Sequence, residues 1–168
     1  MYDFFLFIFF VSLISIIIII ILTLIERTKE KNEFEKLSKS GIDQIDAMTG
    51  REFEIYLSVL FRNLGYKVKL TKASGDYGAD LILKKSGLSI VVQAKRYKKK
   101  VGVKSVQEIT SARFYYSSES SWVVTNNYFT SPAIELAEKT DVKLFDRDDL
   151  VNLILKSKES NEKIIITY

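Results

Sequence analysis

The hydrophobic residues of this chain follow two different patterns along its length. Residues 4–25 form an almost unbroken apolar run with no charged residue, interrupted only by Ser12, Ser15 and Thr23. Beyond Thr49, apolar and polar residues alternate over short stretches with the periods of helices and strands. A charged stretch of mixed sign, residues 26–48, connects the two. The pattern therefore predicts an N-terminal apolar segment, a linker and one globular domain.

The apolar run predicts a transmembrane helix, because a bilayer core needs about 20 such residues. A helix of a globular core usually keeps one polar face, and the six consecutive isoleucines at 16–21 allow no such face. A cleaved signal peptide would need a basic region before the run and a small-residue cleavage motif after it, and both are missing. Lys and Arg only follow the run, which places the rest of the chain in the cytoplasm. We therefore expect a single-pass protein of the cell membrane.

The segments flanking the domain carry weaker signals. In the juxtamembrane linker 26–48, Glu35 and Lys39 stand four residues apart, which favours a solvated helix. Ser40 and Gly41 are expected to end that helix. No structure is assigned to the C-terminal tail 157–168.

The domain, residues 49–156, is expected to open with a helix, because Thr49 and Glu52 have the spacing of a capping box. Gly65 is expected to stop this helix. Strands are expected at 66–70, 80–84, 88–95, 121–125 and 142–145, and further helices at 104–116, from the N-cap Ser131 to about 139, and at 147–156. This order predicts an α/β domain with a central mixed sheet flanked by helices.

The strands at 80–84 and 88–95 bring polar residues to one edge of the predicted sheet. If Ser86 and Gly87 form a tight hairpin turn, the opposite pairs are Lys85 and Leu88, Ile82 and Val91, and Asp80 and Gln93. Opposite residues share a face, and Lys95, two residues beyond Gln93, lies on the same face. Asp80, Gln93 and Lys95 therefore converge.

The composition limits the chemistry of such a cluster. The chain contains no cysteine and no histidine, which excludes disulfides, thiolate or imidazole metal ligands, and histidine-based catalysis. Any bound metal should be a hard ion with oxygen ligands, such as Mg²⁺ or Mn²⁺. Residues 49–156 carry 18 Lys and Arg against 12 Asp and Glu, which favours an anionic partner.

Asp80, Gln93 and Lys95 suit phosphodiester cleavage, which needs a metal that polarises the phosphate and activates a water molecule. Asp80 can supply a carboxylate oxygen to the metal, and Gln93 an amide oxygen. Lys95 can steady the attacking water or the phosphate charge. Glu54, on the first helix of the domain, could complete the site directly or through water.

The surrounding motifs point to a known family. The matching pieces are residues 49–54, 65–66, 75–81, 91–96, 101–103, 124–126 and Ala133. Over Met48 to about Leu155 they resemble the catalytic domain of Mrr-type restriction endonucleases, which belong to the PD-(D/E)xK nucleases and carry glutamine in place of the usual acid. The resemblance implies that Asp80, Gln93 and Lys95 are the metal-binding and catalytic residues and that Glu54 is the helix carboxylate.

Two further features bear on the partner. A basic cluster follows the last catalytic candidate: Arg96, Lys98, Lys99, Lys100 and Lys104. Taken alone it could be a solvated loop or bind anionic lipid; beside a nuclease site it predicts contacts to DNA phosphates. Asp76, in the glycine-rich loop, is a secondary candidate.

The sequence thus predicts a membrane-anchored, metal-dependent endodeoxyribonuclease. A DNA-binding membrane tether that does not cut, and a scaffold that binds anionic lipid, are the alternatives. A homodimer would suit double-strand cutting, and the sequence leaves it open.

Overall fold

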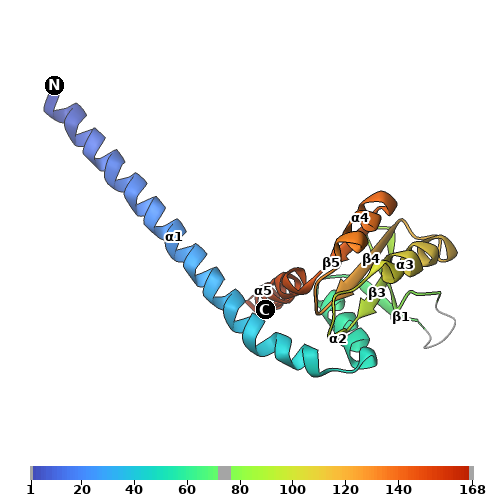
Figure 1. Ribbon diagram of the computed structural model, residues 1–168. Coiled ribbons are helices and arrows are strands. Elements are labelled where there is room, and N and C mark those ends of the chain that lie inside the picture. The colour runs from blue at the N-terminus through green and yellow to red at the C-terminus, as the bar shows by residue number, and fades with distance from the viewer. Residues whose placement is uncertain (1, 72–76, 167–168) are drawn as a thin grey trace. The chain divides into compact units, whose positions relative to one another are not determined.

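The computed structural model describes the backbone of residues 2–71 and 77–166, and side chains at 4–5, 9–25, 27–28, 41–71 and 77–159. The chain divides into two compact units, residues 1–37 and 38–168. The first unit is the N-terminal part of one long helix, α1 (Tyr2–Ala47). The second unit contains the remaining helices and all the described strands (Figure 1).

The expectation of a membrane-spanning helix is wrong. In the described part of the chain, no helix is both long enough and apolar enough to cross a bilayer. The expected single-pass membrane localisation, with a cytoplasmic domain, depended on that span and is therefore not supported.

Helix α1 also continues through the position where an end was expected. It passes Gly41 and ends at Ala47. Ile42 and Ile45 in its last turns are buried, with 0% and 2% exposure. Burying two such side chains stabilises by about 1.5–3 kcal/mol each, more than the roughly 1 kcal/mol that a glycine costs inside a helix. The pair Glu35 and Lys39 lies outside the described side chains.

Helix α2 (Gly50–Asn63) begins as the sequence predicts. The Thr49 hydroxyl accepts a hydrogen bond from the Glu52 amide, and the Glu52 carboxylate accepts one from the Thr49 amide at 2.7 Å. The assignment of Glu52 to capping is therefore confirmed. The buried face of α2 contains Phe53, Leu57, Leu60 and Phe61.

The five strands form one mixed sheet in the order β1-β2-β3-β4-β5: β1 (Lys67–Leu70), β2 (Leu81–Lys85), β3 (Leu88–Lys95), β4 (Ser120–Thr125) and β5 (Val142–Phe145). The first three strands pair antiparallel, and β4 and β5 add in parallel. Ser86 and Gly87 both have positive φ, 52° and 83°, as a type I′ hairpin turn requires. The register places Lys85 opposite Leu88 and Ile82 opposite Val91, which confirms the predicted pairing.

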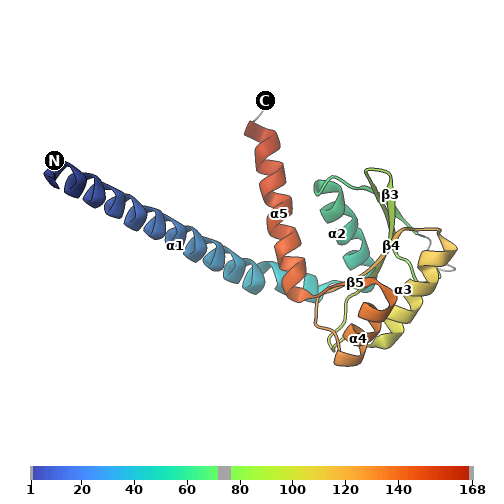
Figure 2. The same ribbon diagram turned by 90° about the horizontal axis from the view of Figure 1, so that it is seen from above.

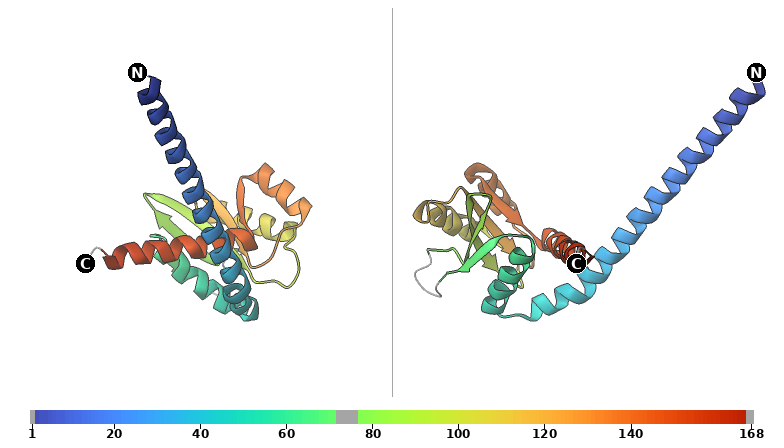
Figure 3. Two further views of the ribbon diagram at one scale, coloured as in Figure 1. Left: turned by 90° about the vertical axis from the view of Figure 1, so that its left-hand side faces the viewer. Right: turned by 180° about the vertical axis from the view of Figure 1, so that it is seen from behind.

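Helices cover both faces of this sheet. Helices α3 (Val103–Tyr115) and α4 (Ser131–Thr140) lie on one face, and α2 and α5 (Arg147–Ile166) on the other (Figures 2 and 3). On the α3 side, Val91 and Val123 of the sheet share one buried cluster with Ile109. The expected α/β domain with a mixed sheet is confirmed.

Two helix ends differ from the prediction. Thr130, not Ser131, caps α4, because Thr130 has the extended backbone and its side chain accepts a hydrogen bond from the Ala133 amide. Helix α5 runs past Lys156 to Ile166, so most of the tail 157–168 continues the helix.

Candidate active site

Asp80 lies immediately before β2 and is bound to the middle of the Gln93-Ala94-Lys95 segment. Its amide donates to the Val92 carbonyl at 2.8 Å, which extends the β2–β3 ladder by one residue. Its carboxylate oxygen Oδ2 accepts a hydrogen bond from the Ala94 amide at 2.7 Å. The backbone of β3 therefore holds the carboxylate of Asp80 at the end of the strand that carries Gln93 and Lys95.

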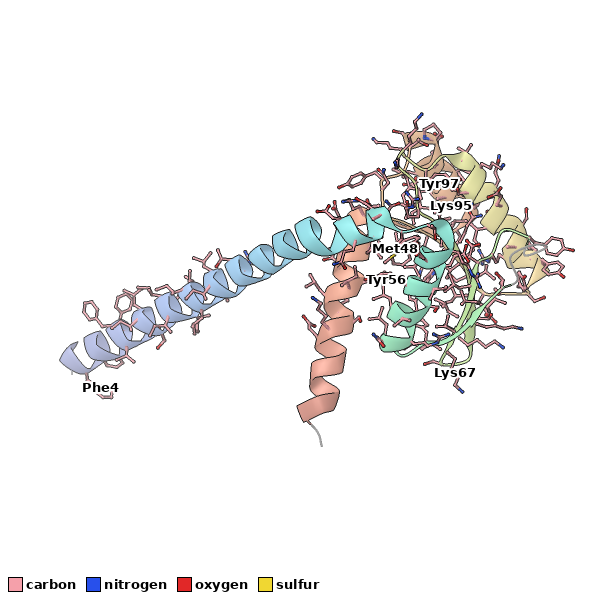
Figure 4. The ribbon with its side chains drawn as sticks, turned by 90° about the horizontal axis from the view of Figure 1, so that it is seen from below. Phe4, Met48, Tyr56, Lys67, Lys95 and Tyr97 are labelled. Carbon is pink, nitrogen blue, oxygen red and sulfur yellow. The ribbon has the colours of Figure 1, made fainter. Side chains whose placement is uncertain are left out.

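Gln93 and Lys95 both point toward α3, where they meet a residue that the sequence reasoning missed. The Gln93 amide nitrogen Nε2 donates to Glu108 Oε2 at 2.8 Å, and Lys95 Nζ lies 3.4 Å from the same oxygen. Lys104 Nζ lies 3.7 Å from the other oxygen, Oε1. Glu108 is the single acidic residue of α3, and no motif spacing ties it to Asp80 or Gln93. Figure 4 shows Lys95 at the end of the sheet away from Lys67.

Gly78 brings the loop before Asp80 close to Glu108. A Cβ atom at position 78 would lie 2.9 Å from Glu108 Cβ and 3.2 Å from the Glu108 backbone carbonyl. Gly78 also has a φ of +91°, which residues with a Cβ rarely adopt. Only glycine therefore allows the loop to pack on α3 at this point, next to the Asp80 strand.

The surroundings of Glu108 favour its ionised form. Partial burial by itself raises the pKa of Glu108. The hydrogen bond from Gln93 and the positive charges of Lys95 and Lys104 outweigh burial and leave the pKa below its usual range. Glu108 is therefore a carboxylate near neutral pH, and both of its oxygens are hydrogen-bond acceptors.

The other end of the Gln93 amide is an acceptor with no partner. Gln93 is 2% exposed, and among the described residues its oxygen Oε1 has no hydrogen-bond partner. Leaving such a group buried and unpaired costs about 1–3 kcal/mol. This oxygen is therefore available to a ligand that supplies positive charge or a hydrogen-bond donor.

The donor set fits a hard divalent cation. No group of three acidic side chains that could hold a metal occurs among the described residues. The site offers a carboxylate oxygen of Asp80 and the amide oxygen of Gln93, both of which suit Mg²⁺ or Mn²⁺. Mg²⁺ usually keeps several water ligands and needs few from the protein.

Glu54 comes from α2, on the opposite face of the sheet from α3. Its carboxylate pairs with Arg51 at 2.6 Å. Thus the structure brings Asp80, Gln93 and Lys95 together through Ala94 and Glu108, and it gives Glu54 a partner on its own helix. Asp76, the secondary candidate, lies outside the described residues.

The basic cluster occupies the loop between β3 and α3 and the first turn of α3. Lys98, Lys99 and Lys100 are exposed, and the Lys104 side chain is 86% exposed. Arg96 is half-buried, and its Nε has no partner among the described residues. The exposed lysines, rather than Arg96, therefore form the outer basic surface beside the site.

A polar network anchors the start of this loop. The Tyr97 amide donates to Asn126 Oδ1 at 2.8 Å, and Asn126 Nδ2 donates to Asp46 at 2.6 Å. Arg147 forms a two-pronged ion pair with Asp46 at 2.9 and 3.0 Å. Burial alone raises the pKa of Asp46, but the hydrogen bonds from Arg147 and Asn126 lower it on balance. The last turn of α1 thus joins the loop that follows Lys95.

A mixed five-stranded sheet with helices on both faces is the architecture of the restriction-endonuclease-like class, and here Asp80, Gln93 and Lys95 lie at one end of its central strands. Residues 45–154 match the family model of the Mrr catalytic domain, whose description is restriction endonuclease. The chain therefore belongs to this restriction endonuclease family, and so to a class of endonucleases. The resemblance seen in the motifs is confirmed.

Solved structures share the fold. The chain is similar to a protein of unknown function, AF1548, with 16% identity and a TM-score of 0.53 over 63% of this chain and 65% of that one. It is also similar to the DNA modification-dependent restriction endonuclease AspBHI, with 24% identity and a TM-score of 0.56 over 82% of this chain and 41% of that one. The chain thus spans less than two thirds of either structure. A comparison with curated proteins finds no match.

Proposed function

We propose that this protein is an endonuclease that hydrolyses phosphodiester bonds of DNA with the help of Mg²⁺ or Mn²⁺. Two observations carry the proposal: the Asp80 carboxylate is hydrogen-bonded to the Ala94 amide, and the neighbouring Gln93 has a buried amide oxygen with no partner among the described residues. Membership of the restriction endonuclease family supports the reaction class.

In this proposal Asp80 and Gln93 hold the metal. A divalent ion held by these two residues would supply positive charge for the phosphate and would lower the pKa of a bound water. Lys95 donates hydrogen bonds to the attacking water or to the phosphate oxygens, and its contact with Glu108 holds its ammonium group near the Gln93 amide. Glu54 would have to leave Arg51 or act through water to contribute to the site.

The exposed lysines of the β3–α3 loop support DNA as the substrate. Lys98, Lys99, Lys100 and Lys104 follow directly on the strand that carries Lys95, so a phosphate backbone at the site would pass near them. Such contacts add affinity without sequence preference. The description of AspBHI as DNA modification-dependent agrees with this substrate class.

The test is cleavage of supercoiled plasmid by the purified full-length chain with Mg²⁺, Mn²⁺ or EDTA. Wild type and Glu135→Ala, which removes an exposed acid on α4, should nick or linearise the plasmid only with metal. Asp80→Ala should not cut, because it removes the one carboxylate among the two proposed ligands. Cleavage by Asp80→Ala equal to wild type would refute the assigned site. DNA binding with no cleavage by wild type would favour a non-cutting DNA-binding protein instead.

A further inference from the structure

Gln93 raises a problem of orientation that a carboxylate at the same position would not raise. Either oxygen of a carboxylate can bind a cation, whereas an amide has one acceptor atom and one donor group of nearly equal size. A rotation of the terminal amide by half a turn exchanges them with little change in shape. A glutamine can serve at a metal site only if something holds its oxygen on the correct side.

Glu108 is placed to hold it. Its oxygen Oε2 accepts the hydrogen bond from Gln93 Nε2 at 2.8 Å, which directs the NH₂ group toward α3. Oε1 then projects away from Glu108, and it is the atom that has no hydrogen-bond partner among the described residues. In the flipped orientation, the amide oxygen would face the Glu108 carboxylate, so two acceptors would meet without a donor between them.

The same carboxylate keeps Lys95 from taking the free oxygen. Lys95 lies two residues along β3 on the same face, and its Nζ is 3.4 Å from Glu108 Oε2. Without this partner, the ammonium group of Lys95 would be free to turn toward the amide oxygen of Gln93, two residues away on the same face of β3. Glu108 thus leaves that oxygen available.

Glu108 is itself held from two sides. Lys104, one turn earlier on α3, lies 3.7 Å from its second oxygen, Oε1. Gly78 packs so closely on Glu108 that a Cβ atom there would be 2.9 Å from Glu108 Cβ. These contacts fix the carboxylate relative to both β3 and the loop that leads into Asp80.

We propose that Glu108 is a positioning residue that sets the amide orientation of Gln93, so that the amide oxygen faces the metal, and that it does not itself bind the metal. This inference rests on the proposed function. It makes a specific demand: dependence on Glu108 should disappear when residue 93 is a carboxylate, because a carboxylate presents an oxygen whichever way it turns.

The experiment compares the full-length wild type, Glu108→Ala, Glu108→Gln, Gln93→Glu and the double variant Gln93→Glu/Glu108→Ala. Mn²⁺ binding is measured by titration calorimetry, plasmid nicking by initial rate, and folding by the thermal midpoint. Glu135→Ala on α4 is the matched control for loss of an exposed acid.

Glu108→Ala should weaken Mn²⁺ binding by about 10–100-fold, as is usual when a residue that orients a metal ligand is removed. Glu108→Gln should lie between Glu108→Ala and wild type, because its own amide can either donate to Gln93 or accept from it. The double variant should recover both binding and nicking relative to Glu108→Ala. That recovery also shows that alanine at 108 permits folding.

Three results would overturn the inference. The first is wild-type Mn²⁺ binding and nicking by Glu108→Ala, which would show that Gln93 does not need Glu108 to orient its amide. The second is a double variant that binds Mn²⁺ and nicks no better than Glu108→Ala, although its thermal midpoint without metal equals that of wild type. Glu108 would then act in another way, for example as a metal ligand. The third is a wild-type protein that neither binds Mn²⁺ nor cuts DNA. This result would refute the proposed function together with this inference, whereas the first two results would refute the inference alone.

Discussion

Gly78→Ala tests whether the close packing of the loop on α3 is as tight as the structure shows. The new Cβ would lie 2.9 Å from Glu108 Cβ and 3.2 Å from the Glu108 backbone carbonyl, against about 3.5–4.0 Å for a comfortable carbon contact. The φ of +91° adds about 1–2 kcal/mol of backbone strain for a residue with a Cβ. Overpacking against a helix backbone adds about 1–3 kcal/mol. We therefore expect Gly78→Ala to lower the free energy of unfolding by about 2–5 kcal/mol.

Gly87→Ala is the matched control. Gly87 has nearly the same φ, +83°, but nothing lies within 4 Å of a Cβ built on it. This variant should cost only the strain, about 1–2 kcal/mol. The difference between the two variants therefore isolates the contact with Glu108.

The assay is urea unfolding followed by tryptophan fluorescence. Trp122, the single tryptophan of the chain, lies in β4 and is 8% exposed, so its emission should report loss of the core. With a denaturant slope of about 1–3 kcal/mol per molar, Gly78→Ala should unfold at a midpoint about 1 M below that of Gly87→Ala. Coincident midpoints for the two variants would refute the close approach between Gly78 and α3.

Three further outcomes are expected. Lys95→Ala should abolish plasmid cleavage while DNA binding in a mobility-shift assay stays within about threefold of wild type, because one of several positive charges is lost; full cleavage would remove Lys95 from the mechanism. Replacing Lys98, Lys99 and Lys100 together by Gln should lower the slope of log binding constant against log salt by up to about 3, and an unchanged slope would place the DNA elsewhere. The ion pair of Asp46 with Arg147 lowers the carboxyl pKa, so its stabilising effect should be present above the usual Asp pKa and be lost as pH falls through the lowered pKa. In urea unfolding, Asp46→Asn should therefore be less stable than wild type at neutral pH and should converge with it in acid, and a constant difference at all pH values would contradict this linkage.

Helix ends and hairpin pairing could be predicted from the sequence where the determining contacts are local. The Thr49–Glu52 capping box spans three residues, and both of its hydrogen bonds form. The two-residue turn at Ser86 and Gly87 makes Lys85 and Leu88 opposite residues, and this pair determines the whole β2–β3 register. Because strand side chains alternate with a period of two, the register also determines which residues share a face. From the sequence alone, that register predicts Asp80 opposite Gln93.

The errors lie where a segment's environment matters more than its own pattern. Gly41 was expected to end a helix, but the buried Ile42 and Ile45 stabilise helix beyond it. Ser131 was expected to cap α4, but the neighbouring Thr130 has the extended backbone that a cap needs. The length and lack of charge of the N-terminal apolar run predict a membrane span, but no helix in the described part of the chain is long and apolar enough to be one.

The sequence by itself determined the fold class, the family and the Asp80, Gln93 and Lys95 candidates, because these rest on local periodicity, turn chemistry and motif spacing. Only the tertiary structure showed Glu108, which lies 15 residues from Gln93 along the chain. It reaches Gln93 because the parallel β3–β4 connection lays α3 across the face of the sheet that carries Gln93 and Lys95. The packing of a crossover helix decides which of its residues faces a given strand. That packing depends on contacts between residues far apart in the sequence, such as Gly78 and Glu108, and the local sequence pattern does not reveal them.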